Sequence, residues 1–473
     1  MRHWDSKARI LLLLLSLGLV RGLIYSAVTP PWQAPDEFRH FEYIKLINEK
    51  GRLVTYKDLS EPLQREIIAS MIKYDYWRFG YAPFPFDPAN PPQSFEEIVE
   101  PFVAHSLYQP PLYYLLSALF LSVVSQTEIT VQLYAMRLFS VILGVLTVLV
   151  AFLTVAEIFP NDDFLLISVP AFVVFLPMHT FITSSVNSDN LAELLVSLVI
   201  YIMVRILRHG TSWLKIMVSG LLVMLGWFTK RTALVSIPIC VITVPLYLWG
   251  RPFRATLSRK HLASIMAVVG AIASGIILYR AKLQALLARF SVRAAGYLML
   301  PSRPLEFLFD REHYTPDALR RYGYFMQRMF MSFWAHFGCL KIRLASFWYQ
   351  IIAVVSLVAF LGLLLFALRL AKTPTLLRKW QKKCLLLLFF CVVLAIIITI
   401  LGMVRIQTVY PAGPPQGRYL FPVIVPIATL FILGLRELFP RRYYQPLLLA
   451  EIGSLFLFDL ICLIGYIIPF FYG

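Results

Sequence analysis

Charged residues are scarce in this sequence. Only 15% of its 473 residues are Asp, Glu, Lys or Arg, whereas 59% are apolar. A water-soluble domain needs more charge than this to cover its surface. The composition therefore excludes an ordinary soluble protein and predicts an all-α polytopic membrane protein, in which helices satisfy their own backbone hydrogen bonds within the bilayer.

Acidic residues are the scarcer of the two signs. The chain has 26 Asp and Glu against 44 Lys and Arg, a formal net charge of +18. In a soluble protein this excess would suggest a nucleic-acid partner. Cytoplasmic loops of membrane proteins also collect Lys and Arg, so we expect membrane lipid and no nucleic acid as a partner.

Cysteine is also rare, and no repeat or low-complexity tract is evident. The five cysteines have no CxxC or ligand-like spacing, and all except Cys339 lie in or at the edge of apolar runs. We interpret them as small residues of the membrane core. This arrangement predicts neither a disulfide framework nor a zinc site.

Long apolar runs are abundant. The first, residues 10–28, has the length of a membrane helix and no convincing cleavage site, which predicts an uncleaved helix with its N-terminus inside. Arg21 within this run is costly in lipid and should face protein or water. Eleven further runs lie at about 111–125, 131–156, 164–182, 190–207, 214–228, 232–249, 262–279, 347–370, 384–403, 419–435 and 446–470.

Basic residues in the loops decide which runs cross. If all runs crossed, "RILRHGTSWLK", "GRPFRATLSRK", "RLAKTPTLLRKWQKK" and "RELFPRRYY", with sixteen Lys and Arg, would lie outside. Short cytoplasmic loops carry such charge. The short run "QPPLYYLLSALFLSVVS" is therefore predicted to be interfacial or re-entrant. Eleven crossings remain in a plasma membrane, with residues 29–130 as a first external loop with juxtamembrane helices and 280–346 as a long external loop.

This topology brings most of the unusual polar residues to one external face. Each sits where a helix begins or ends at the membrane boundary, and ionisable groups there are candidate site residues. The set comprises Asp36, Glu37, His40, Asn187, Asp189, Lys230, Arg231, Arg405, Gln416, Arg418 and Tyr419.

Several of these residues also have ordinary structural interpretations. Asp36 and Asp189 each precede an apolar helical pattern and could be N-caps. Lys230, Arg231 and Arg418 could be interfacial residues that extend to the membrane surface. Asp36 and His40 share a helix face and could together bind a divalent metal. Because no third ligand lies nearby in the sequence, we expect that no metal or other cofactor is required.

Arg418 is the strongest candidate for an anion site. It lies in "PAGPPQGRYLFP", where prolines and glycines fix the loop before a helix. A guanidinium held in this way suits bidentate contact with a phosphate. External carboxylates and cations together fit glycosyl transfer from a lipid-phosphate sugar, because a base takes the acceptor's proton and cations stabilise the leaving phosphate.

The order of the motifs resembles the GT-C superfamily of membrane glycosyltransferases, which includes protein O-mannosyltransferases and aminoarabinose transferases. It is most similar to a GT-C-related family of bacterial integral membrane proteins. The resemblance is carried by "PPWQAPDEFRHF", "VNSDNLAELL", "TKRTALVSIP", "SFWAHFG" and "PQGRYLFPVIVP", which span residues 30 to 426. It implies a catalytic module over residues 1–435, followed by a C-terminal transmembrane helix over 436–473.

The resemblance also implies roles for individual residues. Asp36 would be the catalytic base or position the acceptor, with Glu37 beside it, and Asp189 would complete the site. The donor would be a polyprenyl-phosphate sugar, the reaction inverting, and the acceptor a saccharide, lipid or protein. His40 departs from the mannosyltransferase pattern because it follows Asp36 by four residues instead of three. A transporter or flippase of lipid-linked saccharides and a non-catalytic assembly partner remain alternatives.

Overall fold

The protein is a bundle of long helices in the computed structural model, which describes residues 2–79, 93–95, 109–250, 316–409 and 416–473. The first part of the bundle is built by α1 (Arg2–Val28), α5 (Ile129–Ile158), α6 (Asp163–Phe175), α7 (Pro177–Thr183), α8 (Asp189–His209), α9 (Trp213–Trp227) and α10 (Ser236–Leu248). The second part is built by α16 (Ser346–Lys372), α17 (Lys379–Val409), α18 (Ile424–Glu437), α19 (Tyr444–Cys462) and α20 (Ile468–Tyr472).

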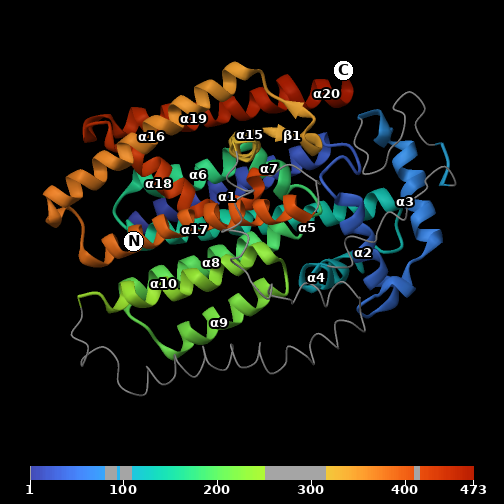
Figure 1. Ribbon diagram of the computed structural model, residues 1–473, viewed down its shortest axis with the longest axis horizontal. Coiled ribbons are helices and arrows are strands. Elements are labelled where there is room, and N and C mark those ends of the chain that lie inside the picture. The colour runs from blue at the N-terminus through green and yellow to red at the C-terminus, as the bar shows by residue number, and fades with distance from the viewer. Residues whose placement is uncertain (1, 80–92, 96–108, 251–315, 410–415) are drawn as a thin grey trace.

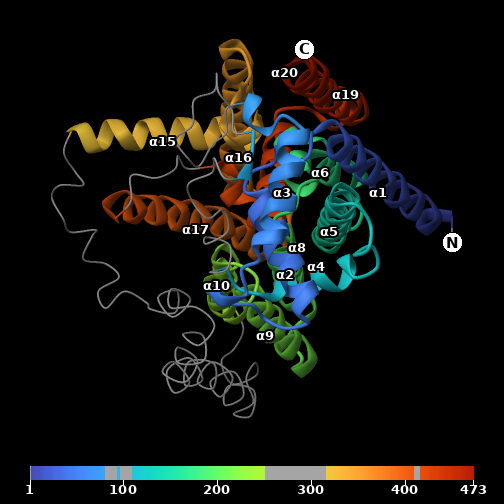
Figure 2. The same ribbon diagram turned by 90° about the vertical axis from the view of Figure 1, so that its right-hand side faces the viewer.

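Shorter elements connect these helices or pack beside them. They are α2 (Glu37–Lys50), α3 (Glu61–Lys73), α4 (Leu112–Leu121), the two 3-10 segments η5 (Arg231–Val235) and η10 (Gly417–Val423), α15 (Pro316–Trp334) and a two-residue hairpin of β1 (His336–Phe337) and β2 (Ile342–Arg343). Figures 1 and 2 show α2, α3 and α4 gathered at the end of the bundle where α1 finishes.

The membrane-spanning character follows from helix length. Among the described residues, eight helices are long and apolar enough to cross a membrane, and α6 with α7 makes a ninth if the bent pair is one span. The all-α polytopic fold is therefore confirmed. Of the eleven crossings expected, the run at 262–279 lies outside the described residues. The run at 214–228 was expected to cross, but it forms the fifteen-residue α9, which is shorter than the eight candidate spans.

The run at 164–182 was expected as one helix but forms two, bent by 63°. Leu176, between them, has an extended ψ of 109°, and Pro177 opens α7. A residue before proline is disfavoured in the helical region, so the break follows from the sequence.

Helix α4 is too short to cross, in agreement with the prediction for "QPPLYYLLSALFLSVVS". Its ten residues extend about 15 Å, half of the hydrocarbon thickness. Its first N–H, from Leu112, is donated to the carbonyl of Phe228 at the end of α9. This bond fixes α4 beside the segment that carries Lys230.

The two chain ends lie at opposite ends of the bundle (Figure 1). The basic turns after α8, α16 and α18 lie at the N-terminal end, as expected if they share one side of the membrane. Arg21 faces protein, as expected: it is 6% exposed, and its Nε donates to Asp459 Oδ2 of α19 over 2.9 Å. This pair joins the first and last long helices.

Candidate active site

Asp36 lies between α1 and α2 and occupies the N-cap position without capping the helix. Its φ is 59°, in the left-handed region, and its side chain makes no cap hydrogen bond. A non-glycine residue there costs about 1–3 kcal/mol and persists only where the surroundings hold it. The carboxylate lies 3.4 Å from Arg418 Nη2 and 3.6 Å from Arg39 Nη1. The side chain is 32% exposed, so it is accessible.

Glu37, the next residue, faces the protein interior. Its carboxylate accepts from Arg137 Nε over 2.9 Å and from Nη2 over 2.6 Å, and neither side chain is exposed. Arg137 also donates to the carbonyls of Ser26, Thr29 and Pro30. This network fixes the turn that carries Asp36.

Arg418 is held by tight backbone packing at the start of η10. A Cβ atom on Gly417 would lie 2.1 Å from the backbone nitrogen of Phe333, so only glycine allows this approach of η10 to α15. The N–H of Gly417 donates to Ser332 Oγ over 2.7 Å. Arg418 is 4% exposed, and its Nε lies 4.0 Å from Asp189 Oδ2. The guanidinium therefore lies between two carboxylates from distant parts of the chain.

Asp189 is the first residue of α8, and its carboxylate is turned toward cations. Its Oδ1 lies 2.7 Å from Lys230 Nζ. The neighbouring Asn187 accepts the Asp189 N–H with its Oδ1 over 2.9 Å. Asn187 therefore satisfies this helix-start N–H, which leaves the Asp189 carboxylate for Lys230 and Arg418. The Asn187 Nδ2 has no hydrogen-bond partner among the described residues.

His40 lies one turn after Asp36 and contacts α4. Its Nδ1 is 2.7 Å from the hydroxyl of Tyr114, which donates to Gln109 Oε1 over 3.0 Å. Burial lowers the pKa of His40 to about 3, helped by the nearby Lys230. His40 is therefore a neutral imidazole at physiological pH.

The acid–base character of the cluster follows from its opposed charges. Desolvation raises the pKa of Asp36, but the Arg418 guanidinium and other nearby positive charges outweigh it and hold this pKa below its usual value. Burial lowers the pKa of Lys230, and Asp189 opposes this shift. Asp36 is thus an ionised, partly exposed carboxylate beside a buried guanidinium.

Four further residues were predicted to belong to the site: Tyr419, Gln416, Arg231 and Arg405. Tyr419 follows Arg418, whose guanidinium carbon is 5.8 Å from its ring centre. Gln416 is the N-cap of η10, and Arg231 begins η5 with an exposed side chain. Arg405 belongs to α17, and its side chain lies outside the described residues.

Three contributors escaped the sequence reasoning: Arg137, Arg39 and Tyr114. A charged residue inside an apolar run was the available signal for Arg137, since such a group requires a partner. Among the described residues no three His, Cys, Asp or Glu side chains are placed to hold a metal ion, so Asp36 and His40 have no third ligand there.

The chain is similar to a family of membrane proteins and to a solved structure. No curated protein matches the chain. A solved structure, the crystal structure of ArnT from Cupriavidus metallidurans bound to undecaprenyl phosphate, is similar over 97% of this chain and 76% of that one, with 14% identity and a TM-score of 0.46. The family described as "Predicted membrane protein (DUF2142)" matches residues 19–427. Because this match covers most of the sequence, the chain belongs to that family of membrane proteins.

Proposed function

We propose that this protein is an inverting glycosyltransferase that moves a sugar from a polyprenyl-phosphate-linked donor to an acceptor at the external face of a plasma membrane. One observation carries the proposal: the accessible Asp36 carboxylate lies 3.4 Å from the buried Arg418 guanidinium. The ordered sequence motifs that resemble GT-C enzymes support it. The external placement rests on the basic turns at the other end of the bundle.

Asp36 is the proposed general base. An acceptor hydroxyl attacks the anomeric carbon, and its proton passes to the Asp36 carboxylate. The bond between the anomeric carbon and the phosphate oxygen breaks, its electron pair stays on that oxygen, and the configuration at carbon inverts. A positioned base of this kind contributes about 10²–10⁴ in rate.

Arg418 is the proposed anchor for the donor phosphate, with Lys230 beside it. A guanidinium presents a rigid fork of donors that matches phosphate oxygens. This guanidinium lies 3.4 Å from Asp36 and 4.0 Å from Asp189. A bound phosphate competes for it and weakens its hold on Asp36, which makes that carboxylate more basic when the donor is present.

The other candidates receive supporting roles. Glu37, buried against Arg137, is assigned to positioning the turn at Asp36 rather than to proton transfer. Asn187, with its unpartnered Nδ2, and Asp189 and His40 are assigned to the sugar or the acceptor. Arg231, Arg405, Gln416 and Tyr419 stay as proposed contributors to donor binding.

Turnover of a polyprenyl-phosphate sugar by the purified protein in lipid nanodiscs tests the proposal. We expect release of polyprenyl phosphate, by transfer or slow hydrolysis, without any ion gradient. Arg418→Lys, which retains the charge but loses the fork, should raise the donor KM. Donor that crosses the bilayer in vesicles while staying intact would favour a flippase and contradict the proposal.

A further inference from the structure

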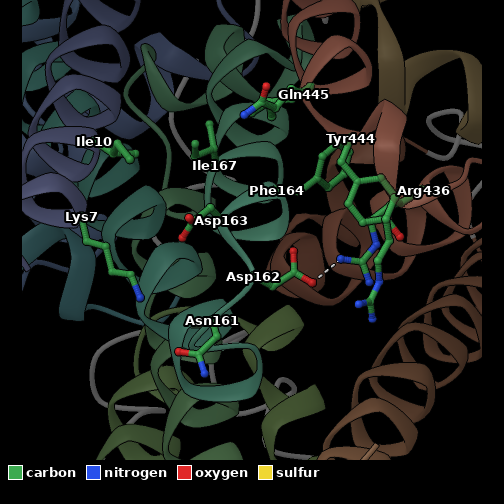
Figure 3. A pocket seen from close by; sticks show the side chains of 12 residues that line it. Lys7, Ile10, Asn161, Asp162, Asp163, Phe164, Ile167, Arg436, Tyr444 and Gln445 are labelled. Atoms are coloured by element: carbon green, nitrogen blue, oxygen red, sulfur yellow. Dashed lines mark hydrogen bonds and ion pairs between the residues drawn. The ribbon is translucent and has the colours of Figure 1, made fainter. Parts of the chain in front are cut away.

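A separate cavity lies at the opposite end of the bundle from Asp36. Its volume is about 650 Å³, and it lies where α1 and α6 begin, α18 ends and α19 begins (Figure 3). The helix α1 of 27 residues, about 40 Å long, separates it from the candidate active site. The cavity is therefore not a part of that site.

Basic side chains line the outer rim of this cavity. Lys7 is the first residue of the first apolar span and Arg441 the first of the last one, so both lie at the membrane boundary. Among the described residues that line the cavity, Asp162 and Asp163 are the acidic ones, and Asp163 also lies at the rim. Asp162 is already engaged, since it pairs with Arg436 and accepts the N–H of Leu165. The remaining charge of the rim is positive.

Arg436 forms a rigid, buried wall of the cavity. It is 8% exposed, and its guanidinium carbon lies 6.0 Å from the ring centre of Phe164 and 5.4 Å from that of Tyr444. Its Nε has no hydrogen-bond partner among the described residues. Figure 3 shows Arg436 between Asp162 and the two rings. Because Nη1 pairs with Asp162 and the rings pack against the guanidinium, its positive charge is held in a fixed place where it lines the cavity.

The lining becomes apolar one helical turn away from the rim. Ile10 lies three residues after Lys7, Ile167 four after Asp163, and Leu448 four after Tyr444. Helix α6 packs against both α1 and α19 and forms a floor between them. Fourteen residues further along α1, Arg21 bonds to Asp459 of α19, about 21 Å from Lys7. Beyond Ile167 the residues of α6 are buried, so the apolar surface open to an acyl chain is the part of the cavity lined by Ile10, Ile167 and Leu448.

We propose that this cavity binds one anionic phospholipid, with its phosphate between Lys7, Arg436 and Arg441 and the start of an acyl chain over Ile10, Ile167 and Leu448. A cationic rim above an apolar cavity lining matches a phospholipid and does not match a wholly polar anion. This proposal rests on the orientation given under the proposed function, in which this end is cytoplasmic. The leaflet on that side carries anionic lipid, and basic pockets between helices bind its head groups.

Native mass spectrometry of the full chain in detergent, titrated with phosphatidylglycerol or phosphatidylcholine, tests the proposal. We expect one phosphatidylglycerol to bind more tightly than phosphatidylcholine. The double variant Lys7→Gln/Arg441→Gln should bind it about thirtyfold more weakly, which is about 2 kcal/mol at 1.4 kcal/mol per tenfold. Asp163→Asn should have the opposite effect and tighten binding.

The matched control is Lys372→Gln/Lys379→Gln, which removes two exposed basic side chains at the same end but outside the cavity. It should change the affinity by less than about twofold, because charges away from the bound lipid are largely screened. An equal loss in this control, no preference for phosphatidylglycerol, or weaker binding by Asp163→Asn would overturn the proposal. Displacement of the lipid by millimolar inorganic phosphate would also overturn it, because the site would then recognise free phosphate.

Discussion

Replacing Glu37 by glutamine is expected to destabilise the protein, whereas the corresponding change at Asp36 is not. Glu37 and Arg137 have no exposed surface, and their two hydrogen bonds measure 2.9 and 2.6 Å. Removing one partner of a buried ion pair costs about 3–5 kcal/mol, because the other charge is left uncompensated. Glutamine keeps the shape and one acceptor, so we expect about 3 kcal/mol. Asp36, one third exposed, retains water at its carboxylate.

Unfolding of the purified protein by a denaturing detergent, followed by the fluorescence of its nine tryptophans, measures this difference. Glu37→Gln should lose about 3 kcal/mol of unfolding free energy, and Asp36→Asn less than about 1 kcal/mol. Glu49→Gln is the matched control, since Glu49 is an exposed acid near the end of the same helix. The double variant Glu37→Gln/Arg137→Met should lose less than the sum of its single changes, by about 0.5–3 kcal/mol.

One result would refute this reasoning. If Glu37→Gln had the stability of the wild type and still lost all donor turnover, Glu37 would act chemically and its assignment as a positioning residue would be wrong. A partial loss of turnover together with a loss of stability is the expected pattern, because the turn around Asp36 is then less well held.

Four further predictions follow from other parts of the structure. Arg418→Lys should lower kcat/KM for the donor by about 10²–10³, because a point charge cannot replace the fork; a change below about threefold would mean that Arg418 is only a structural anchor. The pH profile of kcat/KM should be flat between about pH 5 and 8, since the pKa of Asp36 is lowered and that of His40 is about 3; an inflection near 6.5 that His40→Asn removes would contradict this. In the unfolded chain His40 takes up a proton near pH 6.5, whereas in the folded protein its pKa is about 3. The stability that depends on neutral His40 is therefore present above pH 6.5 and lost as the pH falls toward 3. His40→Asn should reduce this dependence of the unfolding free energy on pH. Asp459→Asn should lower the free energy of unfolding by about 3 kcal/mol, since Arg21 then loses its charged partner among the helices. Wild-type stability of this variant in the detergent titration would show that the pair contributes nothing to stability.

The sequence predicted the helices well because apolar runs and basic turns report directly on membrane crossings. The distribution of basic residues among the loops predicted that α4 does not cross the membrane. Pro177 could also have predicted the break between α6 and α7, but that inference was not made. Helix α15, starting at Pro316, lies within the segment expected as a long external loop. This helix is not among the candidate membrane spans, but the loop prediction did not anticipate it, because a loop was defined there only by the lack of a long apolar run.

The sequence also predicted that Asp36, Asp189, Lys230 and Arg418 share one face, and the structure brings their side chains together. It could not separate Asp36 from Glu37. Adjacent residues at the start of a helix point in different directions, and the direction depends on a partner, Arg137, that lies 100 residues away. The cap interpretations were undecided for the same reason: whether a carboxylate caps its helix or meets a distant cation is set by tertiary packing.

The most direct test of the central claim compares polyprenyl-phosphate release by the wild type and Asp36→Asn in nanodiscs, each with its unfolding free energy measured. The account predicts a loss of about 10²–10⁴ in rate with stability within about 1 kcal/mol of the wild type, while Glu49→Gln keeps full activity. Undiminished release by a well-folded Asp36→Asn protein would contradict the account.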